Sequence, residues 1–277
     1  MVKRLNYQKQ LNKLSELNSS RHSLLSDQNH NSQDFVRFLS NFIINFGDLR
    51  EKSHLILSPE FKPYNKKHFV HIEYKQYISS IVTTLETFFR DTCFFLLVQN
   101  EQMIGELCEF YKLENADTHN LSINDQANYL SACFNFQNFK EIDELFSKIL
   151  GINFWDNLGT SLFRNCSFEN ILLEKISLNQ LIPSWKNSLE ELLFIRNEII
   201  HNANFRLTVN SKFITPAELT VLLVPQFTTL LVAQKYSLKN FKLNYEGKQY
   251  NFLFSIKDLI HSNWQIAEES TSSISLD

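Results

Sequence analysis

The sequence predicts a mainly α-helical protein, and three features of its composition lead to that prediction. Only 5 Gly and 5 Pro, the residues that most often interrupt helices, occur among 277 residues, of which 43% are hydrophobic. Long stretches rich in Leu, Phe, Lys, Glu and Asn place apolar residues three and four positions apart, the spacing of one helix face. A chain of this length suits one elaborated domain or two small ones.

Residues 1–60 are expected to form an N-terminal helical extension. A polar stretch over 4–24 carries leucines on roughly one side. The apolar residues of 35–46 then predict a strongly amphipathic helix that ends at Gly47. The Pro-containing segment 58–64 indicates a linker to the next part of the chain.

A helical domain is expected over 65–205. A long helix is predicted from Tyr74 towards Tyr111, followed by helices over 120–134 and 139–150. Gly151 follows the last of these in a C-cap position, because glycine readily adopts the left-handed conformation that ends helices.

The next predicted helix spans 184–201, after an irregular stretch that runs to about residue 180. Arg196 falls on the helix face that apolar residues mark as the inner one. An arginine on such a face must be paired or must serve a site, because burying an unpaired charge costs several kcal/mol. The apolar residues of this face are Trp185, Leu189, Leu192, Leu193, Ile199 and Ile200.

Residues 206–277 are expected to form a C-terminal extension with a small helix and a β-hairpin. The segment 215–218 has a capping Thr, a Pro in the first turn and a Glu three residues after the cap, the pattern of a helix start. Residues 241–252 alternate between polar and apolar around Glu246-Gly247, which predicts the hairpin. A last short helix is expected near 256–267.

Composition favours a cytoplasmic protein without a membrane segment. The net charge is −3, so no global basic field attracts nucleic acid. The 4 Cys are scattered, which argues against a zinc ribbon or a disulfide framework and suits a reducing compartment. The first residues lack the apolar region of a signal peptide, and the most apolar stretch, 220–233, is too short to span a membrane.

Several common catalytic and cofactor motifs do not occur in the sequence. There is no P-loop, no G-x-G-x-x-G and no G-x-S-x-G, so neither nucleotide hydrolysis by those routes nor serine-hydrolase chemistry has support. His68 and His71 have the spacing of two metal ligands on a helix, but no matching third ligand follows at short spacing. We therefore expect no metal and no cofactor.

The hexapeptide from Arg196 to His201 carries side chains suited to cleaving RNA without a metal. Arg196 supplies a fixed cation for a phosphate, and His201 supplies a group that transfers protons near neutral pH. Residues five apart on a helix differ by about 140° in direction and about 7.5 Å in height. Arg196 and His201 converge on one phosphate if the helix ends near Ile200, or if two copies of the helix meet across a two-fold axis.

This arginine–polar–x3–histidine helix resembles the signature of the HEPN superfamily, in particular members of the toxin–antitoxin and phage-defence type. The segments 85–91 and 138–154 resemble helices of the same domains, so the likeness covers about 70–205, roughly half of the chain. It implies a helical bundle that forms a homodimer through the motif helix. Many members are metal-independent endoribonucleases, whereas others bind nucleotides or act as scaffolds without catalysis.

The resemblance implies a role for each candidate residue. His201 is expected to take the proton from a ribose 2′-OH, and Arg196 to hold the scissile phosphate, so that the product carries a 2′,3′-cyclic phosphate. Asn197 is expected to orient the substrate, with a plain helix-surface role as the alternative. Glu86 is our candidate for a carboxylate that positions Arg196 from a facing helix; the alternative is a surface pair with Arg90.

Partners follow from the same interpretation. RNA is the expected substrate, and the possible RNA contacts outside the motif are Arg206 and Lys212. An antitoxin or another defence-system protein is a further possible partner. The alternative function is a non-catalytic HEPN module that binds a partner protein or a nucleotide, with the acidic net charge and the two extensions in its favour. An ordinary helical scaffold with a coincidental motif is the third possibility.

Overall fold

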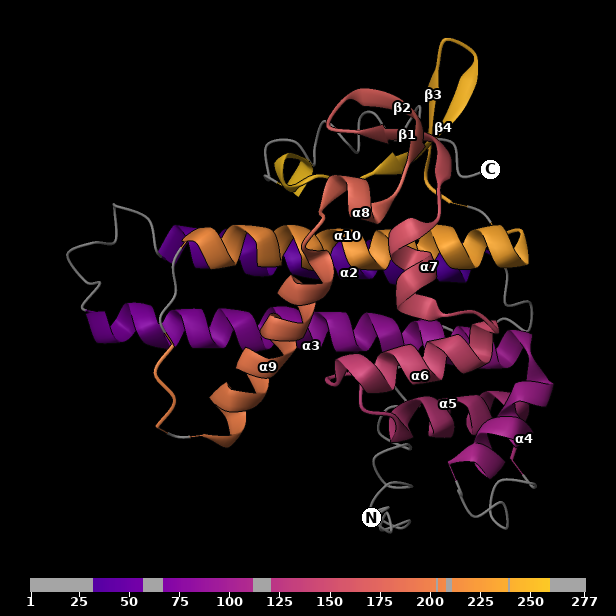
Figure 1. Ribbon diagram of the computed structural model, residues 1–277, viewed down its shortest axis with the longest axis horizontal. Helices are drawn as coiled ribbons and strands as arrows, with labels where there is room; N and C mark the ends of the chain where they lie inside the picture. The colour runs from indigo at the N-terminus through magenta and orange to yellow at the C-terminus, as the bar shows by residue number, and fades with distance from the viewer. Residues whose placement is uncertain are drawn as a thin grey trace.

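Three long helices form the centre of the fold and pack against one another (Figure 1). They are α2 (Ser32–Ile56), α3 (Lys67–Gln99) and α10 (Ser211–Tyr236). The structure is a computed structural model that describes residues 32–56, 67–111, 121–202, 204–207, 211–238 and 240–259. The helix expected over 4–24 and the linker over 58–64 lie outside these residues. Within them helix predominates, so the predicted mainly α class is confirmed.

Helix α2 is longer than predicted, because Gly47 does not end it. Gly47 is buried inside the helix, and the residues beyond it find partners on α10. Arg50 Nε lies 3.2 Å from Glu218 Oε2, and His54 Nε2 lies 3.3 Å from Glu218 Oε1. The Tyr77 hydroxyl of α3 donates a hydrogen bond of 2.6 Å to the same carboxylate. Burial alone raises the pKa of Glu218, but these partners lower it overall, so one carboxylate joins all three helices.

Four shorter helices follow α3 along the chain. The predicted long helix divides at Asn100, whose backbone (φ −137°, ψ 80°) is not helical. The helices expected over 120–134 and 139–150 are present, and Gly151 (φ 63°) caps the second in the left-handed conformation, as predicted. The four are α4 (Glu101–Phe110), α5 (Ile123–Cys133), α6 (Phe139–Leu150) and α7 (Phe154–Thr160).

A four-stranded sheet lies beside the long helices (Figure 1). The strands are β1 (Phe163–Phe168), β2 (Ile171–Ile176), β3 (Lys242–Tyr245) and β4 (Lys248–Leu253). Their order is β2-β1-β4-β3, with two antiparallel hairpins joined by the parallel pair β1 and β4. The hairpin expected around Glu246-Gly247 is therefore confirmed.

The prediction of an irregular stretch before residue 180 is wrong. This stretch contains α7, the β1–β2 hairpin and the short helix α8 (Leu178–Leu181). The hairpin turns at Glu169 and Asn170, both with positive φ (50° and 63°), a geometry usually marked in sequence by glycine. Strand β2 is mostly exposed and lacks an alternating apolar pattern, so the sequence shows neither the turn nor the strand clearly.

Helix α10 is the centre of the core rather than the small peripheral helix that the sequence suggested. It begins at Ser211, four residues before the predicted cap at Thr215, and continues through Pro216 and Pro225. Its residues from Thr220 to Ala233 are all buried. A single hydrophobic cluster includes side chains from all three segments of the chain that the sequence analysis distinguished. The short 3-10 helix Ile256–Leu259 closes the described part of the chain.

The apolar composition of α10 is explained by this burial. Its segment Phe213–Tyr236 is long and apolar enough to cross a membrane, but 83% of its most apolar window is buried inside the fold. It packs against α2, α3 and α9, whose apolar faces surround it. A helix that is apolar on all sides is expected in such a position.

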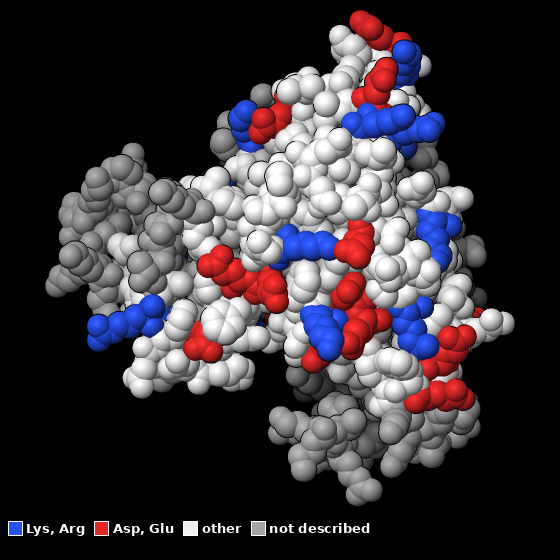
Figure 2. Space-filling model, in the orientation of Figure 1, with Lys and Arg blue, Asp and Glu red and all other residues white. Residues whose placement is uncertain are grey.

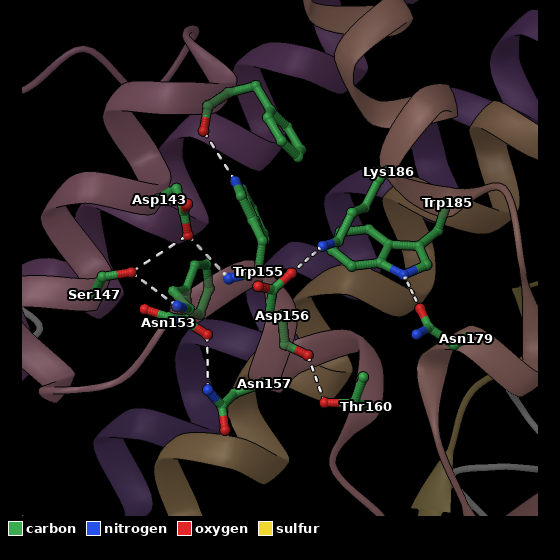
Figure 3. A network of polar contacts seen from close by, with 12 residues as sticks. Asp143, Ser147, Asn153, Trp155, Asp156, Asn157, Thr160, Asn179, Trp185 and Lys186 are labelled. Atoms are coloured by element: carbon green, nitrogen blue, oxygen red, sulfur yellow. Dashed lines mark hydrogen bonds and ion pairs between the residues drawn. The ribbon is translucent and has the colours of Figure 1, made fainter.

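A network of polar contacts fixes α7 against α6 and against the start of α9 (Trp185–His201), as Figure 3 shows. Asp143 of α6 accepts a 3.0 Å hydrogen bond from the backbone N–H of Trp155. The indole N–H of Trp185 donates a 2.7 Å hydrogen bond to Asn179 Oδ1. Lys186 Nζ of α9 also lies 2.6 Å from Asp156 Oδ1 of α7, so the start of the helix that carries the arginine–histidine motif is joined both to α7 and to Asn179.

Replacing Gly159 of α7 with alanine is expected to destabilise the protein. A Cβ atom at this position would lie 2.6 Å from Asn179 Oδ1, the acceptor of the Trp185 hydrogen bond. We expect Gly159→Ala to lower the free energy of unfolding by about 1–2 kcal/mol, measured by urea denaturation. The control is Gly105→Ala in α4, where a Cβ atom meets nothing within 4 Å. There the better helix propensity of alanine is expected to raise stability by about 0.5–1 kcal/mol. Equal stability of the two variants would contradict this account.

Candidate active site on the motif helix

Helix α9 crosses α3 and also packs against α10 (Figure 1). Its start and its inner face agree with the prediction, and Arg196 is buried among the apolar residues of that face, as expected. The prediction is wrong for Ile200, which is 50% exposed. The C-terminal end of α9 extends past α3 in Figure 1, and its last two residues, Ile200 and His201, are exposed. The buried residues are Trp185, Leu189, Leu192, Leu193 and Arg196.

Three elements surround the Arg196 guanidinium, which is 9% exposed. Its Nη1 donates to Gln137 Oε1, in the loop between α5 and α6, and lies 3.5 Å from Asn197 Oδ1 on its own helix. Its Nη2 lies 3.5 Å from Glu86 Oε1 on α3. The ion pair that the sequence suggested between Glu86 and Arg196 is therefore present. Gln137 was not expected, because it lies in a loop, where no helical pattern shows which way a side chain points.

The charges of this cluster are not balanced. Two guanidinium groups, those of Arg90 and Arg196, act on the single carboxylate of Glu86. Burial raises the pKa of Glu86, even though a hydrogen bond from Gln137 and the two cations act to lower it. The Nε atoms of both arginines and Oε1 of Glu86 are buried without a hydrogen-bond partner among the described residues. The cluster thus has more positive than negative charge, and it has N–H donors without an acceptor. A bound anion would balance the charge and accept hydrogen bonds from these donors.

His201 lies at the other end of the motif and is exposed. It is the last residue of α9, and the backbone N–H of Asn202 still donates to Glu198 O at 2.9 Å. The helix therefore ends at His201, one residue after Ile200, and His201 itself keeps helical geometry instead of swinging round towards Arg196. Within one chain, His201 and Arg196 point in directions about 140° apart.

Asn197 lies between the two motif residues. Its Oδ1 faces Arg196 Nη1, and the residue precedes His201 by four positions, which places both on the same side of α9. Asn197 is half-buried, at the border between the inner face and the exposed face. The motif thus places one amide between a buried cation and an exposed histidine.

The segment after α9 is held against the first half of α3. Lys75 Nζ donates to the backbone carbonyl of Phe205, and His71 Nδ1 lies 3.1 Å from the carbonyl of Leu207. His71, considered above as a metal ligand, therefore contacts the backbone. Arg206 lies in this segment and is exposed, whereas the side chain of Lys212 lies outside the described residues. Among the described residues, no group of three or more His, Cys, Asp or Glu side chains is placed to hold a metal ion.

The outer face of α9 combines apolar and acidic side chains. Phe194 is 60% exposed and lies seven residues before His201, on the same side of the helix. Glu190 and Glu191 are also exposed. On the face of the molecule seen in Figure 2, small groups of both charges alternate and no continuous basic surface is present. Any attraction for a nucleic acid on this face must therefore be local.

Comparison with known proteins finds no relative of this chain. No protein-family model matches it, and neither a curated protein nor a solved structure does. The chemistry assigned to the motif helix therefore rests on its residues and their surroundings.

Removing the Arg196 side chain is expected to destabilise the protein in a pH-dependent way. Arg196→Ala leaves the buried Glu86 carboxylate without its nearest cation, which we expect to cost about 3 kcal/mol at neutral pH, measured by urea denaturation. Because the pKa of Glu86 is raised in the folded protein, protonation favours folding, so the cost should shrink as pH falls through that pKa.

The double variant Arg196→Ala/Glu86→Gln is the control, since it removes both charges. It should recover most of the stability at neutral pH and lose the pH dependence. If the double variant were as unstable as Arg196→Ala, the unpaired charge of Glu86 would not be the cause of the lost stability.

Proposed function

We propose that this chain is a metal-independent endoribonuclease of HEPN type, acting in the cytoplasm as a toxin or a phage-defence effector. One observation carries the proposal. A single helix buries Arg196 in a cluster with excess positive charge and unused donors, and exposes His201 at its end. The resemblance of the motif supports the same conclusion and favours the HEPN type of helical bundle.

Phosphate reaches Arg196 past Gln137 in this proposal. The Gln137 side chain is a neutral acceptor on Arg196 Nη1 in a half-exposed loop. A phosphate oxygen is a stronger acceptor for a guanidinium than an amide oxygen, since it carries charge.

A second copy of the chain completes the site. Because His201 and Arg196 diverge within one chain, the catalytic groups converge only if two α9 helices meet across a two-fold axis. Phe194 and Ile200, both largely exposed, flank His201 and supply an apolar contact for such an arrangement. The two helices then share one cleft with two arginines and two histidines.

The reaction uses a nucleophile that belongs to the substrate. One His201 takes the proton of the ribose 2′-OH, and the 2′ oxygen attacks the adjacent phosphorus. Arg196 stabilises the charge on the phosphate oxygens as the bond to the 5′ oxygen breaks. His201 of the second copy donates a proton to that oxygen, leaving a 2′,3′-cyclic phosphate and a 5′-hydroxyl. Asn197 orients the substrate between the two groups.

A second candidate function is favoured by the acidic part of the outer face. Glu190 and Glu191 lie exposed on α9. They suit a contact with a basic protein, such as an antitoxin or a defence partner, better than a contact with RNA. A non-catalytic module that binds such a partner would have the same fold but would not cleave RNA.

Cleavage of RNA in EDTA is the test of the proposed activity. Purified protein is expected to cleave single-stranded RNA to products with 2′,3′-cyclic phosphate ends, and to leave a substrate with deoxyribose at the cleaved position intact. His201→Ala should lower the rate by about 10²- to 10⁴-fold, because it removes the proton-transfer group. Arg196→Lys, which keeps the charge but not the planar fork, should also be impaired.

The matched control is His54→Gln, a change at a partly exposed histidine on α2 outside the motif. It should retain full activity. Absence of cleavage by the wild type, or equal activity of the wild type and His201→Ala, would refute the ribonuclease and favour the docking module.

Dimer formation through α9 is tested separately. Phe194→Glu places a charge in the proposed contact, so we expect it to convert a dimer to a monomer in size-exclusion chromatography with light scattering, and to abolish cleavage. Ile44→Glu changes an exposed apolar residue of α2 and should affect neither property. A wild type that cleaves RNA as a monomer would disprove the shared site.

A further inference from the structure

A pocket of about 490 Å³ lies between the sheet and the C-terminal end of α10. Neither α9 nor α3 contributes to it, so it is separate from the motif residues. Its volume falls within the range of small-molecule sites, about 300–1,000 Å³. Apolar side chains, among them Phe163 and Leu230, form part of its wall.

The charged residues of the pocket are both basic. Arg164 of β1 and Lys242 of β3 line it, and no Asp or Glu is among the described lining residues. Lys and Arg side chains lie beside Asp and Glu side chains over the strands of the sheet in Figure 2, so the basic character is confined to the pocket lining. Burial lowers the pKa of Lys242, because the ammonium group is partly removed from water. A bound anion would offset that cost.

Asn251 of β4 holds the Lys242 side chain and the backbone at Arg164 in place. Its Oδ1 accepts a 2.6 Å hydrogen bond from Lys242 Nζ, and its Nδ2 donates a 3.1 Å hydrogen bond to the backbone carbonyl of Arg164. The parallel pair β1 and β4 brings these positions together. The Lys242 ammonium group and the strand that carries Arg164 are therefore positioned before any ligand binds.

Asn240 supplies an unused polar group in the same wall. The residue is 9% exposed, and its Oδ1 atom is buried without a hydrogen-bond partner among the described residues. A buried carbonyl oxygen without a donor costs stability, so a ligand that brings an N–H or O–H group would be favoured there.

The C-terminal end of α10 disfavours the binding of an anion in the pocket, but only weakly. A helix C-terminus carries about half a negative charge, and the last-turn carbonyl of Ala233 is already engaged by the N–H of Leu238 at 3.0 Å. Two full positive charges, on Arg164 and Lys242, outweigh this contribution.

We propose that this pocket binds a small organic phosphate. The phosphate lies between Arg164 and Lys242, the organic part packs against Phe163 and Leu230, and a donor of that part pairs with Asn240. A nucleoside monophosphate has all three features: an anionic end, a flat aromatic base whose faces pack against apolar side chains, and N–H and O–H donors. The sheet is then a ligand-binding element rather than a cover for the helices.

The test is binding of AMP, adenosine and inorganic phosphate to the full chain by isothermal titration calorimetry. We expect AMP to bind at least ten-fold more tightly than either of the other two. Arg164→Ala, at an exposed position where folding is not at risk, should weaken AMP binding about ten-fold or more, and Asn240→Asp should weaken it by charge repulsion. Lys248→Ala, on β4 but not lining the pocket, is the matched control and should bind as the wild type does.

Four results would overturn the proposal. No AMP binding by the wild type would refute the site, and equal affinity for AMP and adenosine would show that the cations play no part. Equal affinity for AMP and inorganic phosphate would show that the organic part is not recognised. Arg196→Lys distinguishes this pocket from the motif helix, because it should leave AMP binding unchanged. If Arg196→Lys lost AMP binding while Arg164→Ala kept it, AMP would bind at the motif cluster and not in this pocket.

Discussion

The burial of one positive charge organises the candidate site. Arg196 is enclosed by α3, by the loop between α5 and α6, and by its own helix, and it contacts Glu86 and Gln137 there. Because successive residues of a helix turn by about 100°, an inward Arg196 requires an outward His201. The rotation of α9, the exposure of its histidine and the need for a second copy in the proposed reaction all follow from this constraint.

Two buried carboxylates in this fold show how a structural ion cluster differs from a candidate site. Glu218 has partners on both oxygens, from Arg50, His54 and Tyr77, and its pKa is lowered. Glu86 has one oxygen without a hydrogen bond, and burial raises its pKa. A satisfied carboxylate holds helices together, whereas an unsatisfied one beside cations with free donors is what functional sites often contain.

The errors of the sequence-based prediction have a common physical origin. Gly47 was taken as a helix end because glycine is a frequent C-cap, yet the contacts of Arg50 and His54 with Glu218 keep that helix intact over another two turns. The β1–β2 hairpin was missed because its turn lacks glycine and its outer strand lacks an apolar pattern. In the first case a contact with a distant segment outweighed the local preference, and in the second the pairing of β1 with the distant β4 supports a hairpin that the local sequence does not mark.

Local sequence was sufficient for the helical class, for most helices of the middle region, for the second hairpin and for the inward position of Arg196. Each of these depends on residues within a few turns of one another, which set the hydrophobic period and the turn chemistry. The tertiary structure alone decided that Gln137 contacts Arg196, that α10 lies at the centre, and that β1 pairs with β4 to form a basic pocket. Those features depend on pairing between segments tens of residues apart, and their free energy comes from packing and charge burial that no local pattern records.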